Sequence, residues 1–125
     1  MMQEPILTIT ENGTQEWRVD GRRHRLDGPA IIEADGSQEW WVNGHRHRLD
    51  GPAVIWADGS QVWWVDGEVH RLDGPAVIWA DGQQEWWVND RNITPEVHEW
   101  MDRLNINPNW REWTDKERVL FRTSF

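Results

Sequence analysis

The stretch NGHRHRLDGPAVIWADGSQVWWVDG, from Asn43 to Gly67, decides the fold because its phrases recur along the chain. The heptapeptide HRLDGPA begins at His24, at His47 and again at His70, which sets a period of 23 residues without an insertion. Four units follow from this phase, 1–23, 24–46, 47–69 and 70–92, and the first lacks the heptapeptide but keeps the phrases QEW and VDG. Such periods are typical of repeat proteins, in which each unit buries its apolar face against its neighbours.

Each unit contains two runs that are typical of β-strands. In the third unit they are PAVIWA (52–57) and QVWWV (61–65), both rich in β-branched and aromatic residues. The ADGS segment between them favours a type I′ hairpin turn, and the second run ends in a VDG or VNG turn. We therefore predict a mostly β protein, an antiparallel meander of about eight strands, two per unit. Short Asp-Gly turns should line one edge, and longer polar HRLDG loops the other.

Tryptophan fills two columns of the repeat almost completely. We expect the invariant column to form the core; its members are Trp17, Trp40, Trp63 and Trp86. Equivalent residues of successive units should lie about 10 Å apart, because two strand spacings separate them. Neighbours such as Trp40 and Trp41 should point to opposite faces of the sheet, which makes both faces aromatic.

A third column is less regular, since it reads Thr10, Glu33, Trp56 and Trp79. The repeat does not require tryptophan at this position. Trp56 and Trp79 are therefore candidates for an exposed binding platform of the kind that stacks on bases or sugars.

The last third of the chain has a helical pattern. Thr94-Pro95-Glu96 predicts a helix start, with threonine as N-cap and proline at the first helical position. The helix would place Val97, Trp100, Met101 and Leu104 on one stripe. A second helix or turn is expected in 107–118, and 119–125 is compatible with a final strand. We predict that 93–125 packs on the sheet as a C-terminal cap within a single domain, either over the last repeat or across one face.

The composition excludes several classes of protein. The chain of 125 residues has 12 tryptophans, no cysteine and a net charge of −9. The missing cysteines exclude disulfides and thiolate metal sites, and the acidity argues against general binding to nucleic acid or anionic membranes. We find neither a secretory leader pattern nor an apolar run of the ~20 residues that span a bilayer, so we expect a cytoplasmic protein.

Four basic residues break the repeat just after the turns: Arg22, Arg23, His45 and Arg46. The repeat dictates no partner for them, so they are candidates for binding an anionic ligand or an acidic protein surface. In contrast, three arginines recur in register with three aspartates, and we expect each to pair with its carboxylate or to stack on a tryptophan of the neighbouring unit. These structural pairs are Arg25 with Asp27, Arg48 with Asp50 and Arg71 with Asp73.

The motifs of catalysis and metal binding are missing from the sequence. His45 and His47, with Asp50 nearby, form a common kind of surface pair, so we expect no metal site. There is no nucleophile with a plausible base, no phosphate-binding loop and no H-E-x-x-H motif, so we expect no catalytic residue and no cofactor. The recurring carboxylates are interpreted as a solvated face; they are Glu16, Glu39 and Glu85.

The repeat resembles the MORN repeat, a 23-residue β-hairpin unit with aromatic strands, an NG turn, a loop histidine and a DGS turn. Asn43-Gly44, His47 and Asp58-Gly59-Ser60 stand at the corresponding positions. The chain departs from that pattern where a GxG would follow the histidine, since it has Arg48-Leu49-Asp50-Gly51-Pro52. The HRxDGPA variant is similar to small MORN-like proteins of tailed phages and bacteria whose repeats run into an acidic helix and an aromatic tail. This resemblance implies a binding or scaffold role and no enzymatic one.

Three functions are compatible with these observations. The first is a phage accessory protein that binds and blocks a host component, in particular one of a defence system. The second is a sponge that captures a nucleotide or another small anion on the Arg/His edge and the tryptophan faces. The third is a structural spacer. A protein partner is expected most, the oligomeric state is left open, and mimicry of nucleic acid has little support because no long acidic run is present.

Overall fold

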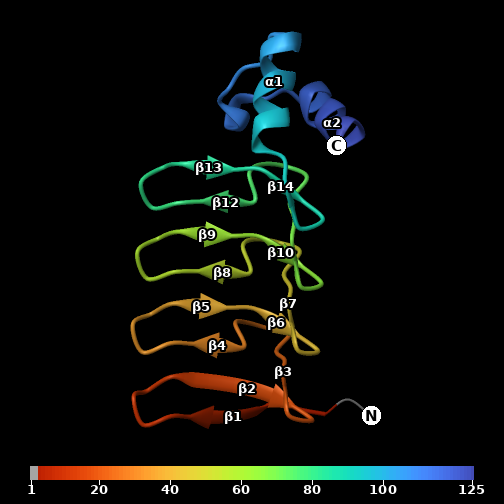
Figure 1. Ribbon diagram of the computed structural model, residues 1–125. Coiled ribbons are helices and arrows are strands. Elements are labelled where there is room, and N and C mark those ends of the chain that lie inside the picture. The colour runs from red at the N-terminus through yellow and green to blue at the C-terminus, as the bar shows by residue number, and fades with distance from the viewer. Residues whose placement is uncertain (1–2) are drawn as a thin grey trace.

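A computed structural model describes residues 3–125 as a ladder of β-hairpins with two helices at one end (Figure 1). The main sheet is antiparallel, and its strands follow the order β1-β2-β4-β5-β8-β9-β12-β13, with β3 pairing β2. The predicted fold class and meander order are therefore confirmed. The strands of the main path are β1 (Ile6–Ile9), β2 (Gln15–Val19), β4 (Ile31–Ile32), β5 (Gln38–Glu39), β8 (Val54–Ile55), β9 (Gln61–Val62), β12 (Val77–Ile78) and β13 (Gln84–Glu85).

The segments expected to be long loops contain strands of their own. Three small antiparallel hairpins form beside the main sheet: β6 (Trp41–Val42) with β7 (His45–Arg46), β10 (Trp64–Val65) with β11 (Glu68–Val69), and β14 (Trp87–Val88) with β15 (Arg91–Asn92). In the first unit β3 (Arg22–Arg23) plays the same part against β2.

The second run of each later unit is thus divided in two at the invariant tryptophan. The N–H of Trp40 donates to the carbonyl of Ala53 in the next hairpin, and its carbonyl accepts from the N–H of His47. Trp17 and Trp63 make the equivalent pairs of bonds. The backbone of this column therefore joins the main sheet to the small hairpins.

The two kinds of turn differ from the prediction. In the ADG turns between the two runs of a unit only glycine has positive φ, for example 94° at Gly59. Gly59 N–H donates to the carbonyl of Trp56, which indicates a type I turn followed by a left-handed glycine. Both central residues have positive φ in the other series of turns, for example 51° at Asn43 and 82° at Gly44. The type I′ turns therefore close the small hairpins, including the Asp66-Gly67 turn, and the assignment of that turn type to the ADG segment between the two runs of a unit was wrong.

Buried serines connect successive Asp-Gly turns. Ser60 N–H donates to Asp58 Oδ1 at 2.8 Å, and Ser60 Oγ accepts from Ala80 N–H of the next unit at 2.9 Å. Ser37 makes the same bond to Ala57 N–H. The backbone N–H of Ser60 lowers the pKa of Asp58 below its ordinary value, since it bonds to the charged carboxylate.

Replacing Ser60 by alanine is expected to lower the free energy of unfolding by about 1 kcal/mol, because Ala80 N–H in the next turn loses its hydrogen bond to the buried Ser60 hydroxyl. Gln83 occupies the same repeat position but is exposed and lies in the last unit, so Gln83→Ala should change little. Urea denaturation followed by far-UV circular dichroism would measure both. A similar loss for the two variants would contradict this role of the serine.

The C-terminal segment caps the last repeat and does not lie across a face of the sheet (Figure 1). It consists of α1 (Thr94–Leu104), the short 3-10 helix η1 (Trp110–Glu112) and α2 (Asp115–Ser124). The expected final strand is instead helical, because α2 begins with a capping box between Thr114 and Glu117. The stripe of α1 buries Val97, Trp100 and Met101 but leaves Leu104 exposed.

Thr94 has a different role from the one expected. It is the first residue of α1, and its side chain makes no N-cap bond. Its Oγ1 accepts from Trp86 N–H at 2.9 Å. In earlier units the carbonyl of an alanine in the next repeat accepts the equivalent N–H, so Thr94 supplies the bond that a further repeat would otherwise provide.

Candidate functional site

The four variable basic residues lie on the first strand-like segment after each type I′ turn, on β3 and β7. The charges of Arg23 and Arg46 are paired with carboxylates there. Arg23 Nε bonds to Glu16 Oε1 at 2.9 Å, and Arg46 Nε bonds to Glu39 Oε1 at 2.9 Å. These two arginines therefore belong to the repeat structure, and the expectation that they lack dictated partners was wrong.

Arginine and tryptophan alternate along this row. The guanidinium of Arg46 lies 5.2 Å from the ring centre of Trp41 and 5.1 Å from that of Trp64, and Arg23 lies 5.0 Å from Trp41. Contacts of this length are cation–π interactions. Glu39, which pairs with Arg46, also accepts a hydrogen bond from Trp41 Nε1 at 3.2 Å.

The glutamate column is not a solvated face. Glu39 is only 5% exposed, because the Trp41 ring and Arg46 cover it. Glu16 is half-buried, and the hydrogen bond from Arg23 lowers its pKa below the ordinary value. Glu85 has no arginine and instead accepts from the indole N–H groups of Trp79 and Trp87, at 2.7 and 3.0 Å.

Arg22 and His45 remain exposed. The aliphatic carbons of Arg22 lie beside Gly44 of the next type I′ turn, and a Cβ at Gly67 would lie 3.2 Å from His45 Nδ1. Of the four predicted basic residues, only these two present their polar ends to solvent without a carboxylate partner within residues 3–125.

The invariant arginines pair with the invariant aspartates and also stack on tryptophan. Arg48 Nε bonds to Asp50 at 3.0 Å, and its guanidinium lies 3.9 Å from the ring centre of Trp40. Arg25 and Arg71 repeat the arrangement on Trp17 and Trp63. The salt bridges join Arg25 to Asp27 and Arg71 to Asp73.

This stacking explains why the invariant tryptophans are not uniformly core. Trp17, Trp40 and Trp63 are half-buried, with arginine over one face of the ring. Only Trp86 is fully buried, because the helical cap covers it. The core expected along the whole column is therefore concentrated at its C-terminal end.

Each loop histidine accepts a backbone hydrogen bond from the next type I′ turn. His24 Nδ1 accepts from Asn43 N–H, His47 Nδ1 from Asp66 N–H, and His70 Nδ1 from Asn89 N–H, all at 3.0 Å. A nitrogen that accepts carries no proton, so each of these bonds corresponds to the ring tautomer with the proton on Nε2. His47 Nδ1 also lies 3.2 Å from Asp66 Oδ1. The histidines of the heptapeptide are thus structural. No group of three or more His, Asp or Glu side chains in residues 3–125 is arranged to hold a metal ion.

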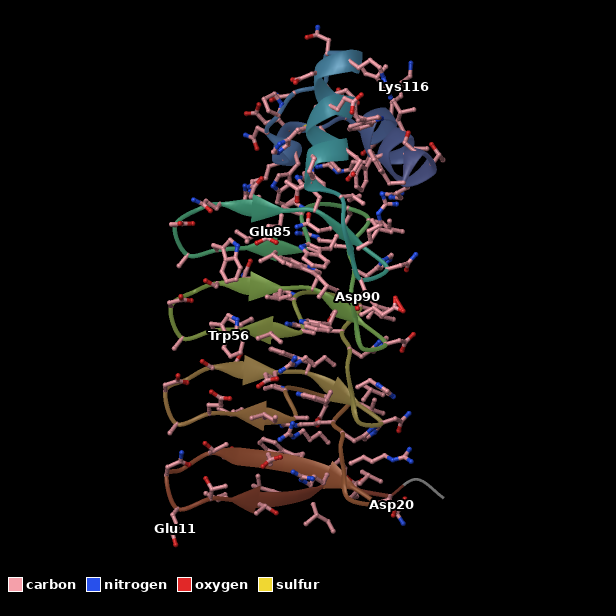
Figure 2. All side chains as sticks on the ribbon, in the orientation of Figure 1. Glu11, Asp20, Trp56, Glu85, Asp90 and Lys116 are labelled. Atoms are coloured by element: carbon pink, nitrogen blue, oxygen red, sulfur yellow. The ribbon has the colours of Figure 1, made fainter. Side chains whose placement is uncertain are left out.

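Trp56 and Trp79 are partly exposed, at 36% and 41%. Figure 2 shows Trp56 towards the edge of the Asp-Gly turns, whereas Asp20 and Asp90 mark the opposite edge, where the type I′ turns lie. Since Arg22 and His45 adjoin the type I′ turns, the structure does not bring the tryptophan pair and the basic residues together.

Glu33 occupies the position equivalent to Trp56 and Trp79. Burial, followed by the nearby carboxylates of Glu39 and Asp35, raises the pKa of Glu33 above its ordinary value. Ionisation of Glu33 is therefore less favourable in the folded protein than in the unfolded chain.

Replacing Glu33 by glutamine is expected to raise the melting temperature at pH 7. A carboxyl group whose pKa is raised on folding stabilises the fold when protonated, and that stability is lost as the pH rises through the folded-state pKa. The gain should disappear below the ordinary pKa of glutamate, where wild type is protonated too. Thermal melts of wild type and variant between pH 3.5 and 8 would show this. Glu11→Gln, in the exposed first turn, controls for net charge, and an equal gain there would contradict the local effect.

The heptapeptide loops contain two exposed leucines that are not among the predicted binding residues. Leu26 is 64% exposed and Leu49 is 80% exposed, although the repeat holds leucine at this position in all three copies. The sequence did contain a signal for these leucines. An apolar residue that recurs in a polar loop does not belong to a strand and therefore calls for another role.

Comparison with protein-family models, with curated proteins and with solved structures returned no match to this chain. The resemblance to the MORN repeat therefore stays a prediction from the sequence motif. None of the helices in residues 3–125 is long and apolar enough to cross a bilayer.

Proposed function

We propose that this chain is a non-catalytic binding protein and that its partner is another protein. The observation that carries the proposal is the set of large apolar side chains left exposed at repeat positions: Leu26, Leu49, Trp56 and Trp79. Repetition places such residues in rows, and rows of exposed apolar side chains mark interaction surfaces. The sequence resemblance narrows the proposal to a phage accessory protein that blocks a component of host defence.

The charged residues support a protein partner over a small anion. Five arginines of the repeats are already bonded to carboxylates, and within residues 3–125 Arg22 is the one predicted binding arginine that is not: Arg23 and Arg46 bond to Glu16 and Glu39, and Arg25, Arg48 and Arg71 bond to aspartates. A phosphate would have to displace these partners, with a net charge of −9 opposing its approach.

We therefore expect no rise in melting temperature with nucleoside mono-, di- and triphosphates or cyclic dinucleotides at millimolar concentration. Ligand that binds the folded state raises its stability by about 2.7 kcal/mol at a hundredfold excess over Kd. Differential scanning fluorimetry would detect that readily. A rise of several degrees with one nucleotide would favour the sponge function instead.

Affinity capture tests the proposal itself. The tagged chain would be used as bait in a lysate of the bacterial host, with two variant baits, Leu26→Ser/Leu49→Ser and Trp56→Ser/Trp79→Ser. We expect a stoichiometric protein that wild type retains and one of the two variants loses. If wild type and both variants retain the same proteins as the tag alone, the chain is a spacer and the proposal fails. A captured protein with no part in host defence would contradict the narrower assignment.

A further inference from the structure

Two equal cavities lie between successive heptapeptide loops and form one groove along the ladder. Each has a volume of about 660 Å³, the first between residues 25–29 and 47–50 and the second between residues 48–51 and 70–73. They share Arg48, Leu49 and Asp50, so they lie on the two sides of one loop and follow each other along the ladder. We call this feature the loop groove.

The loop groove has a mixed lining, in which tryptophan and valine form an apolar strip beside arginine, histidine and aspartate side chains. Trp40 and Val42 line the first cavity, and Trp63 and Val65 line the second. The exposed Leu49 stands between the two cavities. Because the same parts recur in both, a partner that follows the groove meets one apolar notch per repeat.

The heptapeptide loops give the loop groove an acidic rim even though the groove contains arginines, and the exposed Arg122 of α2 adds a positive charge at the second cavity. The side chains of Asp27, Asp50 and Asp73 are 87%, 86% and 64% exposed, whereas those of the paired Arg25, Arg48 and Arg71 are only 23%, 23% and 12% exposed. Carboxylates are thus presented to solvent while the guanidinium groups lie against tryptophan rings. A partner carrying positive charge is complementary to this rim.

The repeat spacing selects the conformation of such a partner. Successive notches are about 10 Å apart, which is two strand spacings. A polyproline II segment advances about 9.3 Å in three residues and presents every third side chain on one face. A β-strand alternates faces, so its residues on one face repeat at about 6.8 or 13.6 Å and miss this spacing.

We propose that the loop groove binds an extended, basic, proline-containing segment of a partner protein, with an apolar side chain at every third position in successive notches. Lysine or arginine between the apolar residues then lies over the aspartates of the rim. This inference rests on the proposed binding function and names the surface and the chemistry of the partner.

Fluorescence anisotropy with synthetic peptides tests the inference on the purified chain. The probe is a fluorescein-labelled peptide of four Leu-Pro-Lys triplets, and we expect saturable binding that weakens with added salt. Four Leu-Pro-Glu triplets should bind at least about tenfold more weakly, because their charge repels the rim. Three Leu-Pro-Lys-Lys units, with leucine at every fourth position, should also lose about tenfold. Equal binding of all three peptides, or of none, would overturn the proposal, as would tighter binding of a Leu/Lys α-helix with leucine at every seventh position.

Leu49→Ser locates the binding. Leu49 is exposed, so the variant should melt like wild type and yet bind the Leu-Pro-Lys probe at least about tenfold more weakly. Leu104→Ser removes an exposed leucine from α1 and should leave the affinity unchanged. Equal loss in both variants would place the peptide elsewhere. If the peptides fail to bind while the lysate capture returns a protein that Leu26→Ser/Leu49→Ser retains, the groove is wrong and the binding function stands; if both fail, the binding function is wrong too.

Discussion

Replacing Trp86 by alanine is expected to lower the free energy of unfolding by about 3–5 kcal/mol, as large truncations in a core do. Trp86 is 2% exposed and stacks on Trp113 with ring centres 5.4 Å apart. Its ring also packs against the ring of Phe121 of α2, with ring centres 5.2 Å apart. The side chain thus joins the last repeat to the cap, and its loss leaves a cavity that both parts line.

The matched control is Trp17→Ala, at the same repeat position in the first unit. Trp17 is half-buried and is covered on one face by Arg25 at 3.9 Å, so its loss should cost only about 1–2 kcal/mol. Guanidinium denaturation followed by far-UV circular dichroism would compare the two, since the loss of a tryptophan complicates fluorescence. Equal losses would show that the whole column is core, as the sequence pattern alone suggested.

The repeat was readable from the sequence because it depends on spacing. A fixed period with a turn at each end of two strand-like runs leaves the meander as the simplest order of strands, and the structure has that order. The helix of α1 was also predictable, since its apolar stripe has a helical period. The helix or turn expected in 107–118 contains η1 and the start of α2, but α2 continues from its capping box at Thr114 and Glu117 through the segment expected as a final strand.

Burial was harder to predict because an arginine can cover a tryptophan as well as an apolar side chain can. The sequence shows a column of identical tryptophans, but their surroundings differ: Arg25 covers Trp17, whereas the helical cap covers Trp86. The sequence also did not show which part of the repeat array the C-terminal cap covers. The cap packs on the last repeat through the apolar cluster around Trp86, and Thr94 replaces the backbone acceptor that a further repeat would supply.

The candidate site was only partly predictable for the same reason. Arg46 looked free because its partner Glu39 lies seven residues earlier, in a column that reads as polar surface. One signal did point to the pair. Where the third unit has Val62 in place of the glutamate, it has Val69 in place of the arginine. The simultaneous change of both positions within one chain indicates that the two side chains are in contact.

The pair of Glu39 and Arg46, which the third unit replaces by two valines, leads to the second large expected effect. Replacing Arg46 by alanine should lower the free energy of unfolding by about 2–3 kcal/mol, because it leaves the buried carboxylate of Glu39 without its ion pair. It also removes the guanidinium between Trp41 and Trp64. This expected loss of stability lies at or below the lower end of the range for broken buried ion pairs, because a third of the Arg46 side chain is exposed. Arg22→Ala, on the exposed side of β3, is the matched control and should cost less than about 0.5 kcal/mol.

The double variant Glu39→Val/Arg46→Val separates the cost of an orphaned charge from the value of the pair. It reproduces in the second unit what Val62 and Val69 do in the third, where both pack in or against the apolar cluster around Ala76 and Val77. A buried ion pair replaced by apolar residues of fitting shape is often neutral or stabilising, so we expect the double variant to lie within about 1 kcal/mol of wild type. The single variants Glu39→Val and Arg46→Val complete a double-mutant cycle, measured by urea denaturation, and should show a strong coupling between the two positions. If the losses of the single variants simply add in the double variant, the two side chains act independently. The row of glutamate, arginine and tryptophan would then be held by the arginine–tryptophan contacts, with the ion pair contributing little.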